Sequence, residues 1–353
     1  MCQGWNRFVC FGRTFLIAIL PVLVAGCGQL SYLSHLGWHQ GYITYYSVPV
    51  PEVLEQESID GTVKDKIRFI QEVKSYGEER LGLRKTGSYS KFFESSGPVL
   101  YMVTACPKDR LHLLSWKFPI VGEVTYKGFF GREGALKEKR SLDERGFDTF
   151  VQGAGAYSTL GWLKDPIFSS MLKWDDATLA NLILHEMTHA TFYIKGETSL
   201  NEQVATFIGN QGAVDFFKER HGPNSIEVTE ANHAQEDDLL FSRWVNRACE
   251  QVSRLYDQDI SREEKLKGRE DLFRSLKDDF RRVKTQFKTE SCPDLERLEL
   301  NNAVLLAYRR YFHQLERFEA LYKNLGQDLR KVVEHFKEIQ ASGKKAAVAS
   351  TLR

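Results

Sequence analysis

Hydrophobic and polar residues follow a helical spacing in one early segment of the chain and strand-like runs in the next. Apolar side chains recur close to helical spacing between positions 62 and 84, at Val63, Ile67, Ile70, Val73 and Leu81. This spacing predicts a helix, whereas the nearly continuous apolar run at 98–105 favours a buried strand. Further elements are expected as strands at 118–121, 124–130 and 147–151, a turn at Gly122 and a polar helix at 136–145.

The second half of the chain is helical in its pattern. Before it, a glycine-rich, aromatic stretch at 153–163 predicts one more strand, bulged or exposed, because glycine inside a strand marks close backbone approach. From Asp175 to about Gln340 the residues favour helices, with one break near Cys292 and Pro293. A helix, then mixed strands, then helices indicates the α+β class. We expect a mixed-sheet part at about 62–171 and a helical part at about 175–340.

The N-terminus has the pattern of an export signal. It carries Arg7 and Arg13, no acid, and then an apolar run from Phe15 to Ala25. The run is shorter than the roughly 20 residues that cross a bilayer, and it has the flanks of a signal-peptide core. The small residues before Cys27 resemble the processing site of a bacterial lipoprotein, which implies cleavage before Cys27 and lipidation of its sulfur. An ordinary signal peptide, or a short buried helix with an incidental cysteine, is the alternative.

This interpretation divides the chain and predicts its location. We expect a cleaved signal peptide at 1–26, one domain at 27–340 and a disordered tail at 341–353. A lipid on Cys27 attaches the protein to the membrane without a transmembrane helix, which places it in the bacterial cell envelope. Gly28 stands where lipoproteins retained at the inner membrane usually have aspartate, so the outer membrane, facing the periplasm, is favoured.

Composition and charge exclude several classes of protein. The chain has 353 residues, of which 42% are hydrophobic and 27% charged, as in ordinary globular proteins. A mostly disordered chain, a fibre and a multi-pass membrane protein are therefore excluded. The formal net charge of +1 provides no basic field for nucleic acid, so no nucleic-acid partner is expected. Outside residues 1–26 the cysteines are Cys27, Cys106, Cys249 and Cys292. Any pairing among the last three stays open, and no CxxC spacing suggests a cysteine metal site.

One motif indicates a class of reaction. Asp175 and Asp176 open a predicted helix in which His185 and His189 are four residues apart, so both imidazoles lie on one face. This spacing lets two nitrogens bind one metal ion at ~2.0–2.1 Å. Glu186 lies about 100° further round the helix, where it can take a proton from a zinc-bound water. This is the HExxH arrangement of zinc peptidases, and a solvated histidine pair is the alternative for the motif alone.

A tetrahedral zinc site needs a third protein ligand, and the next helix supplies a candidate. Glu202 is predicted in the first turn of that helix, and a turn at Gly196 would bring two antiparallel helices together. The small residues Ala205 and Gly209 would let these helices approach closely. Taken alone, Glu202 is explained as well by the helix dipole. Beside the motif, we expect Glu202 to be a ligand of Zn²⁺.

The chain resembles the bacterial predicted-aminopeptidase lipoprotein family, within the glutamate-zincin class of HExxH metallopeptidases. The resemblance rests on the lipoprotein signal and on Gly77–Leu83, Phe118–Gly122, Lys127–Phe130, Ala156–Trp162, His185–His189, Asn201–Glu202 and Asn301–Ala303. It implies a zincin-like fold, in which a small mixed or antiparallel sheet and the HExxH helix are followed by a largely helical C-terminal half. It also implies a membrane-anchored zinc peptidase, an aminopeptidase acting on peptide substrates.

Other candidate residues are less constrained by the sequence. Tyr157 and Tyr308 are expected to stabilise the oxyanion of the tetrahedral intermediate, ahead of Tyr193, Tyr311, His221 and His233. Ser158, Thr159 and Leu160 are expected to hold the substrate backbone by strand addition, with a plain sheet edge as the alternative. Asn301 and Asn302 are expected to have a structural role. A zinc endopeptidase of the envelope, or a non-catalytic lipoprotein with a structural metal site, are the alternative functions.

Overall fold

The computed structural model describes residues 30–118, 121–290 and 293–343. Contacts between residues divide the chain into two units, Met1–Tyr46 and Ser47–Arg353. Within the first unit, residues 30–46 form one helix. The predicted signal peptide, with Cys27, lies outside the described residues, as does most of the predicted tail. Among the helices that are described, none is long and apolar enough to cross a membrane.

The second unit mixes short strands with longer helices, which confirms the prediction of an α+β fold. The strands are β1 (Val48–Pro49), β2 (Lys91–Phe93), β3 (Leu100–Pro107), β4 (Trp116–Phe118), β5 (Gly122–Val124), β6 (Lys127–Phe129), β7 (Phe147–Ala154) and β8 (Ile167–Phe168). The helices are α2 (Val50–Glu55), α3 (Gly61–Glu79), α4 (Arg132–Glu144), the 3-10 helix η1 (Ser169–Lys173), α5 (Asp176–Thr191), α6 (Thr198–His221), α7 (Ile226–Tyr256), α8 (Arg262–Lys284), α9 (Asn302–Phe312), α10 (Leu315–Asn324) and α11 (Leu329–Ser342). The fold is therefore mostly helical, with small sheets.

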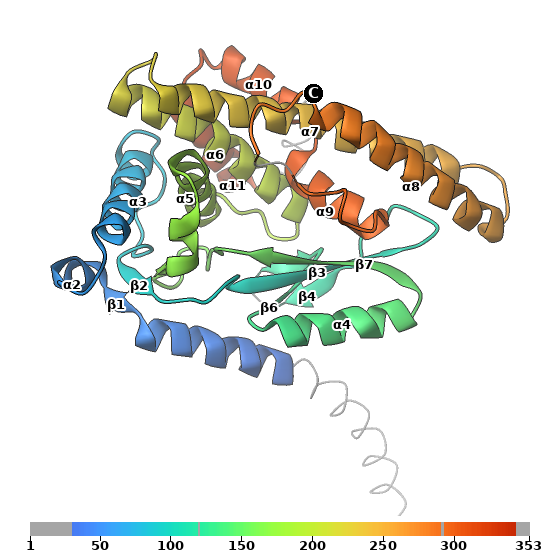
Figure 1. Cartoon of the computed structure of the whole chain (residues 1–353), viewed down its shortest axis with the longest axis horizontal. Helices are drawn as coiled ribbons and strands as arrows, with labels where there is room; N and C mark the ends of the chain where they lie inside the picture. The colour runs from blue at the N-terminus through green and yellow to red at the C-terminus, as the bar shows by residue number, and fades with distance from the viewer. Residues whose placement is uncertain (1–29, 119–120, 291–292, 344–353) are drawn as a thin grey trace, which may run out of the picture. The chain divides into compact units, whose positions relative to one another are not determined.

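The main sheet has the antiparallel order β6–β3–β7. Its centre, β3, is the predicted apolar run, and it pairs with β7 along its whole length. Figure 1 shows α4 on one face of this sheet and α9 on the other, so both faces of β3 are covered. Val103, Ala105 and Cys106 of β3 are fully buried as a result. A strand that is covered on both faces explains why its sequence is a run and not an alternation.

The strand predicted at 153–163 is wrong beyond Ala154, where β7 ends, because the rest of the segment forms an irregular turn. Leu160 and Gly161 have φ angles of 57° and 73°, which an extended strand does not adopt. The buried carboxylate of Asp165 closes the turn by accepting hydrogen bonds from the backbone N–H and the hydroxyl of Thr159, at 2.9 and 2.8 Å. Glycine marks a left-handed turn here and not a bulge within a strand.

Of the strand predicted at 118–121, Phe118 ends β4, residues 119 and 120 lie outside the described residues, and Val121 is in a turn. The strand predicted at 124–130 is divided, since Val124 ends β5 and Lys127–Phe129 form β6. β4 and β5 form a separate two-stranded hairpin, whose second strand starts at Gly122 with a φ of 82°. β6 instead joins the main sheet beside β3. The sequence pattern could not separate them, because three-residue strands are too short to show an alternation.

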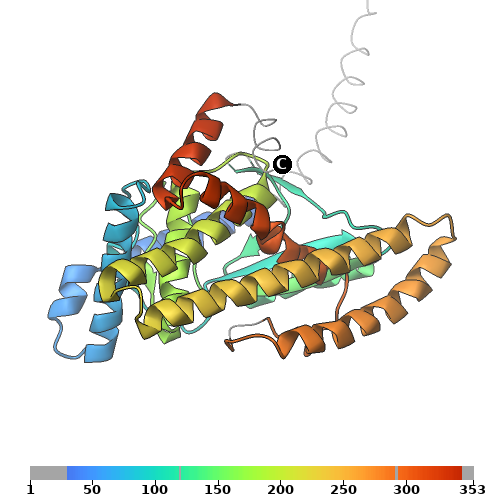
Figure 2. The same cartoon turned by 90° about the horizontal axis from the view of Figure 1, so that it is seen from above.

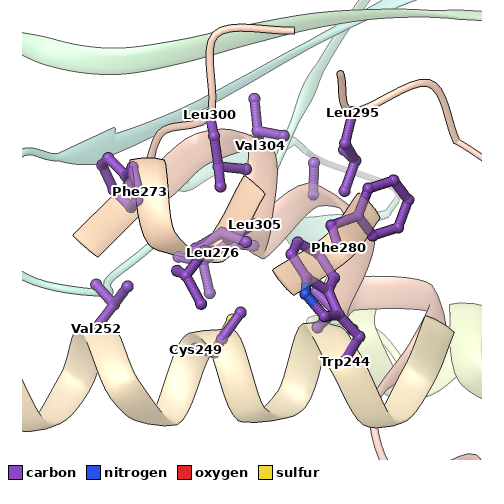
Figure 3. Close-up of a cluster of buried hydrophobic side chains, with 14 of the residues drawn as sticks. Trp244, Cys249, Val252, Phe273, Leu276, Phe280, Leu295, Leu300, Val304 and Leu305 are labelled. Carbon is purple, nitrogen blue, oxygen red and sulfur yellow. The ribbon is translucent and has the colours of Figure 1, made fainter. Parts of the chain in front are cut away.

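The long helices α7 and α8 lie side by side, and α7 also packs against α9 (Figure 2). A hydrophobic cluster fills the space between these three helices (Figure 3); among its members are Trp244, Cys249, Val252, Phe273, Leu276, Phe280, Leu295, Leu300, Val304 and Leu305. Cys106 of β3 belongs to the same cluster.

Cys106 and Cys249 are both free thiols, and burial raises the pKa of each to about 12, so both stay protonated and unreactive. Cys292 lies outside the described residues.

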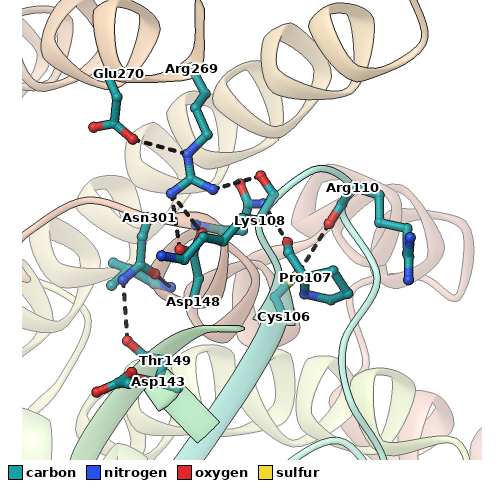
Figure 4. Close-up of polar contacts among 12 residues, drawn as sticks. Cys106, Pro107, Lys108, Arg110, Asp143, Asp148, Thr149, Arg269, Glu270 and Asn301 are labelled. Atoms are coloured by element: carbon teal, nitrogen blue, oxygen red, sulfur yellow. Dashed lines mark hydrogen bonds and ion pairs between the residues drawn. The ribbon is translucent and has the colours of Figure 1, made fainter. Parts of the chain in front are cut away.

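A buried polar cluster ties α8 and α9 to the main sheet (Figure 4). Arg269 of α8 forms an ion pair with Asp148 of β7 at 2.9 Å, and both side chains are only 5% exposed. Arg269 also donates to the backbone carbonyl of Lys108, and Asp148 accepts the backbone N–H of Asn302. Asn301 is the N-cap of α9, and its side-chain oxygen accepts a backbone N–H of that helix. The structural role predicted for these two asparagines is confirmed.

Candidate metal centre

The helix α5 presents the two motif histidines on one face and buries its opposite face. Asp175 caps the helix by accepting the backbone N–H of Thr178, as the sequence predicts. Residues on the apolar face are fully or almost fully buried, namely Leu179, Ala180, Ile183, Leu184 and Met187. On the other face, the side chains of His185 and His189 are 14% and 11% exposed. The packing of α5 therefore fixes the direction in which both imidazoles point.

A tight connection brings α6 back along α5, so that Glu202 faces the histidines. Gly196 turns the chain with a φ of 83°, a conformation that favours glycine. Asn201 braces the connection, because its side chain accepts the backbone N–H of Ile194 and donates to the carbonyl of the same residue. Glu202 follows directly, with its side chain 9% exposed. The predicted helical hairpin is confirmed.

Gly209 sets how closely α5 and α6 approach each other. A Cβ atom at this position would lie 2.9 Å from the backbone oxygen of Asn181 and 3.3 Å from the Cβ of His185. Real side-chain atoms do not approach a backbone oxygen this closely, so only glycine fits. Ala205, one turn earlier on α6, is fully buried. The predicted close approach through these small residues is therefore present in the structure.

Three donor atoms meet at a spacing that fits one metal ion. The Nε2 atoms of His185 and His189 are 3.2 Å apart, and Oε2 of Glu202 lies 3.4 Å from each of them. In a regular tetrahedron with bonds of ~2.05 Å, neighbouring ligand atoms are about 3.3 Å apart. The three atoms thus form one triangular face of such a tetrahedron, and the fourth corner is left for water or substrate. Within the described residues, this is the one group of His, Cys, Asp or Glu side chains that could hold a metal ion.

The charges at this triangle also suit a cation. Burial alone would raise the pKa of the Glu202 carboxyl, but the charge of His189 and the hydrogen bonds from both histidines outweigh burial and hold that pKa well below its ordinary value. Burial would likewise lower the pKa of His189, yet the adjacent Glu202 raises it. The carboxylate is therefore ionised and strongly favours positive charge beside it. A divalent ion that displaces the imidazole protons would satisfy the same carboxylate.

Glu186 lies beside the triangle and is not part of it. Burial raises the pKa of its carboxyl, the charge of Glu202 adds to the rise, and the two histidines oppose it. The side chain is only partly covered, in contrast to the carboxylate of Glu202. Burial also raises the pKa of Asp165 to about 6, and the charge of Glu186 contributes to that rise, so these two carboxyl groups are close enough to interact. A carboxylate with a raised pKa next to a metal site is suited to accept and return a proton.

Three tyrosines lie close enough to Glu202 for its charge to act on them. Burial, followed by the charge of Glu202, raises the pKa values of Tyr126, Tyr193 and Tyr311, that of Tyr193 to about 12. All three therefore keep their hydroxyl protons and can donate hydrogen bonds. The ring of Tyr311 lies 6.3 Å from the ring of His185. The hydroxyl of Tyr193 donates to the backbone carbonyl of Val121 at 3.1 Å, which leaves Tyr311 as the better placed donor.

A family comparison agrees with this geometry. A model of a protein family described as "Putative aminopeptidase" matches residues 31–350. The chain belongs to this family. The range matched to the aminopeptidase family contains α5 and α6 with all three donor atoms, and it begins inside the helix of residues 30–46. No curated protein and no solved structure matches the chain.

The two predicted oxyanion tyrosines of this aminopeptidase-family chain both pack against other aromatic rings. The ring of Tyr157 packs 5.5 Å from Phe130 and 5.6 Å from Phe168. The ring of Tyr308 packs against Phe150 and Phe241, at the hydrophobic cluster under α7. Tyr311 is three residues further along α9. The catalytic roles of Tyr157 and Tyr308 stay predictions, and the geometry favours Tyr311.

The predicted substrate-binding residues lie in the turn after β7, which touches α5. A Cβ atom added to Gly161 would lie 3.4 Å from the Cβ of Ala190, the residue after His189. Ser158, Thr159 and Leu160 are thus held near the motif helix, although by a turn and not by a strand. The next residue along, Trp162, is 75% exposed. The roles of Ser158, Thr159 and Leu160 in substrate binding stay predictions.

Sequence reasoning missed Arg310, a buried cation close to the tyrosines. It donates to the hydroxyl of Thr104 and to the carbonyl of Thr125, and its guanidinium lies 5.0 Å from the ring centre of Tyr126. Its positive charge lowers the pKa of the Tyr311 hydroxyl, in opposition to burial. Its Nε and Nη1 atoms are buried and have no hydrogen-bond partner among the described residues. The helical spacing could have predicted that Arg310 is buried, because position 310 lies four residues after Leu306, on the buried face of α9.

Proposed function

We propose that the protein is a zinc-dependent aminopeptidase, with His185, His189 and Glu202 as the metal ligands. The observation that carries this proposal is the triangle of their three donor atoms, with edges of 3.2 and 3.4 Å. Two imidazoles and one carboxylate, with a fourth position open, are a donor set that suits catalytic zinc. Family membership supports peptide bonds as the substrate and removal of N-terminal residues as the reaction.

Glu186 is the proposed general base. When bound, zinc supplies a Lewis acid that polarises the carbonyl of the scissile bond and makes water more acidic. Glu186 then accepts the proton of the attacking water and gives it to the departing amine. Its position beside the triangle, its partial exposure and its raised pKa support both steps. The same carboxylate is unsuitable as a fourth ligand, because it lies outside the group of donor atoms.

Tyr311 is the proposed donor to the oxyanion that forms at the scissile carbonyl. Burial keeps its proton in place, and the charge of Arg310 lies close enough to act on the hydroxyl. A donor that is already oriented stabilises developing charge without reorganisation, which is the main advantage of such groups.

A zincin-like fold is part of the same proposal. It is supported by the order of the elements, in which a sheet is followed by the motif helix and a helical C-terminal half.

The substrate is proposed to enter beside the turn of residues 158–163. This turn lies against α5 next to His189, and it exposes the indole of Trp162 and the side chain of Leu163. Exposed apolar side chains beside a metal site suit contact with substrate side chains. Because Asp165 locks the turn through Thr159, the surface offered to the substrate is rigid.

The protein is proposed to be a lipoprotein of the bacterial envelope, anchored at Cys27 and facing the periplasm from the outer membrane. The apolar run and the small residues before Cys27 support this location, as does Gly28. Cys27→Ser should leave an unprocessed or soluble precursor. Membrane fractionation and the mass of the N-terminal peptide measure this, and normal processing of the variant would show that the anchor is elsewhere.

Digestion of a peptide library, read by mass spectrometry, tests the enzymatic proposal. The wild type should remove residues stepwise from free N-termini, whereas internal cuts would indicate an endopeptidase. Glu186→Gln should keep its zinc and lose about 10²–10⁴-fold in kcat. Glu334→Gln, an exposed substitution on α11, is the matched control and should behave as the wild type. Zinc without hydrolysis of any peptide by the wild type would instead indicate a structural metal site.

A further inference from the structure

The helix of residues 30–46 has an unusual surface for a protein in water. Five of the eight large hydrophobic side chains that are exposed in the described residues belong to this one helix: Leu30, Trp38, Tyr42, Tyr45 and Tyr46. Trp38 and Tyr45 are 75% and 81% exposed. Contiguous exposed apolar surface of this kind marks a site of interaction.

The aromatic side chains form a stripe along one side of the helix. Trp38, Tyr42 and Tyr45 follow each other at intervals of four and three residues, which places them on one face. The rings of Tyr42 and Tyr46 lie 4.5 Å apart, and those of Tyr45 and Tyr46 lie 5.0 Å apart. The neighbouring exposed positions hold only small or short polar side chains, apart from one histidine: Ser31, Ser34, His35, Gly37, Gly41 and Thr44. The aromatic rings therefore project further from the helix than the neighbouring exposed side chains.

The helix also lacks formal charge. No Asp, Glu, Lys or Arg occurs between Arg13 and Glu52. Burial, assisted by the neighbouring His35, lowers the pKa of His39, so its imidazole is neutral at pH 7. By contrast, the exposed face of α8 is crowded with acids and bases, as expected for a helix in water. A neutral helix can leave water without the cost of transferring charges.

We propose that residues 30–46 lie in the interfacial layer of a lipid bilayer, with Trp38, Tyr42 and Tyr45 directed into the membrane. Tryptophan and tyrosine combine an apolar ring with a polar group, and both are enriched where lipid headgroups meet acyl chains. A second protein would be expected to fix these rings through ion pairs at the rim of its pockets, and the uncharged flanks of the stripe offer no partner for an ion pair. Because the helix is neutral, the partner is a zwitterionic lipid surface and needs no anionic lipid.

The position of the helix in the chain supports this partner, and this step rests on the proposed anchor at Cys27. Two residues, Gly28 and Gln29, separate Cys27 from Leu30, and three extended steps along the chain span at most about 10 Å. A lipidated Cys27 would thus bring the start of the helix to the membrane surface. The helix is about 25 Å long, and it contains His35, His39 and Gln40. These polar side chains favour an orientation along the surface over one that crosses the bilayer.

Depth measurements with an attached fluorophore test this proposal. The mature protein carrying Cys292→Ser is labelled with an environment-sensitive dye at Tyr45→Cys and placed in phosphatidylcholine vesicles. Cys106 and Cys249 are buried, so they do not compete for the dye. Lipids with a nitroxide near the headgroup should quench the dye several-fold more than lipids with a nitroxide at mid-chain, and iodide in the water should quench it little. A dye at Glu263→Cys, at an exposed position of α8, should show the opposite pattern.

Each other result would overturn the proposal in a recognisable way. Equal quenching by iodide at positions 45 and 263 would show that the helix faces water or a protein. Strongest quenching by the mid-chain nitroxide would show that the helix crosses the membrane. The mass of the N-terminal peptide separates this inference from the anchor: an acylated protein whose dye stays in water refutes the interfacial helix alone. In an unacylated protein Cys27 would itself take the dye, so this arm uses Cys27→Ser in addition. If the native protein is unacylated and the dye of this variant enters the lipid, the helix is supported and the anchor is refuted.

Discussion

Replacing Gly209 by alanine should weaken metal binding without touching any ligand. The new methyl group would lie 2.6 Å from Oδ1 and 2.9 Å from the backbone oxygen of Asn181 on α5. The side-chain oxygen can rotate away, but the backbone oxygen cannot move without its helix. Restoring an ordinary separation of about 3.4 Å therefore requires α5 and α6 to separate by roughly 0.5 Å. His185 is on one of these helices and Glu202 on the other.

The size of the effect follows from the ligand triangle. Adding this shift to the present 3.4 Å between Oε2 of Glu202 and each histidine nitrogen gives about 3.9 Å. With bonds of ~2.05 Å, the angle between two ligands at the metal would open from about 110° to about 145°. Zinc tolerates such an angle poorly in a four-coordinate site. Changes in the surroundings of metal ligands typically cost 10–100-fold in affinity, and we expect a loss of this size.

Competition with a calibrated chelator measures the zinc affinity, and Gly212→Ala is the matched control. Position 212 is on the same helix, and its added methyl would lie 2.7 Å from Cδ1 of Leu184, a side-chain atom that can rotate. Both variants gain the helix propensity of alanine, about 1 kcal/mol. They therefore differ only in the atoms that the added methyl group contacts. Gly212→Ala should bind zinc within about two-fold of the wild type. Equal affinity in Gly209→Ala would refute the claim that this contact sets the ligand triangle.

Three further outcomes are expected from the same geometry. Tyr311→Phe should keep its zinc and its KM but lose about 10²-fold in kcat in peptide hydrolysis, and an unchanged kcat would assign the oxyanion donor to another residue. Asp238→Asn should gain stability over the wild type as pH rises from 5 to 8: burial raises the pKa of Asp238 to about 7, so the folded wild type binds a proton that the unfolded chain releases, and its stability falls through this window. Thermal unfolding of both proteins at pH 5 and pH 8 measures the stability difference between Asp238→Asn and the wild type. An equal stability difference at the two pH values would contradict this prediction. Asp148→Ala should cost about 3–5 kcal/mol in denaturant unfolding, because the guanidinium of Arg269 stays buried without its carboxylate; a cost below about 1 kcal/mol would show that water reaches the pair.

The features of the metal centre that can be predicted from the sequence are those determined by residues close together in the chain. The spacing of His185 and His189, the cap at Asp175 and the turn at Gly196 all act within a few residues, and each is present in the structure. Glu202, the proposed third ligand, also lies close in sequence, because a short turn returns the chain directly. The apolar run at β3 was equally clear, since a strand covered on both faces must be apolar throughout.

The choices that the sequence leaves open are decided by contacts that are distant in sequence. Tyr308 and Tyr311 are on one helix, and only the packing of α9 on the sheet decides which ring faces His185. The glycines of residues 153–163 are compatible with a bulged strand or with a turn. Asp165, whose hydrogen bonds decide for the turn, has no local feature that marks it. The position of each tyrosine and the conformation of residues 153–163 can therefore be decided only once the fold is known.

The metal centre depends for its shape on parts of the chain that do not touch it. Its core collects groups that are costly to bury, namely the carboxylate of Glu202 beside two imidazoles and the guanidinium of Arg310 with two unpaired nitrogens. Such groups do not hold helices together by themselves. The hydrophobic cluster under α7 and the ion pair of Arg269 with Asp148 fix α9 on the sheet, and α9 carries Arg310 and Tyr311. The apolar face of α5 fixes the histidines in the same manner. Stability supplied at a distance therefore offsets the cost of burying this polar arrangement.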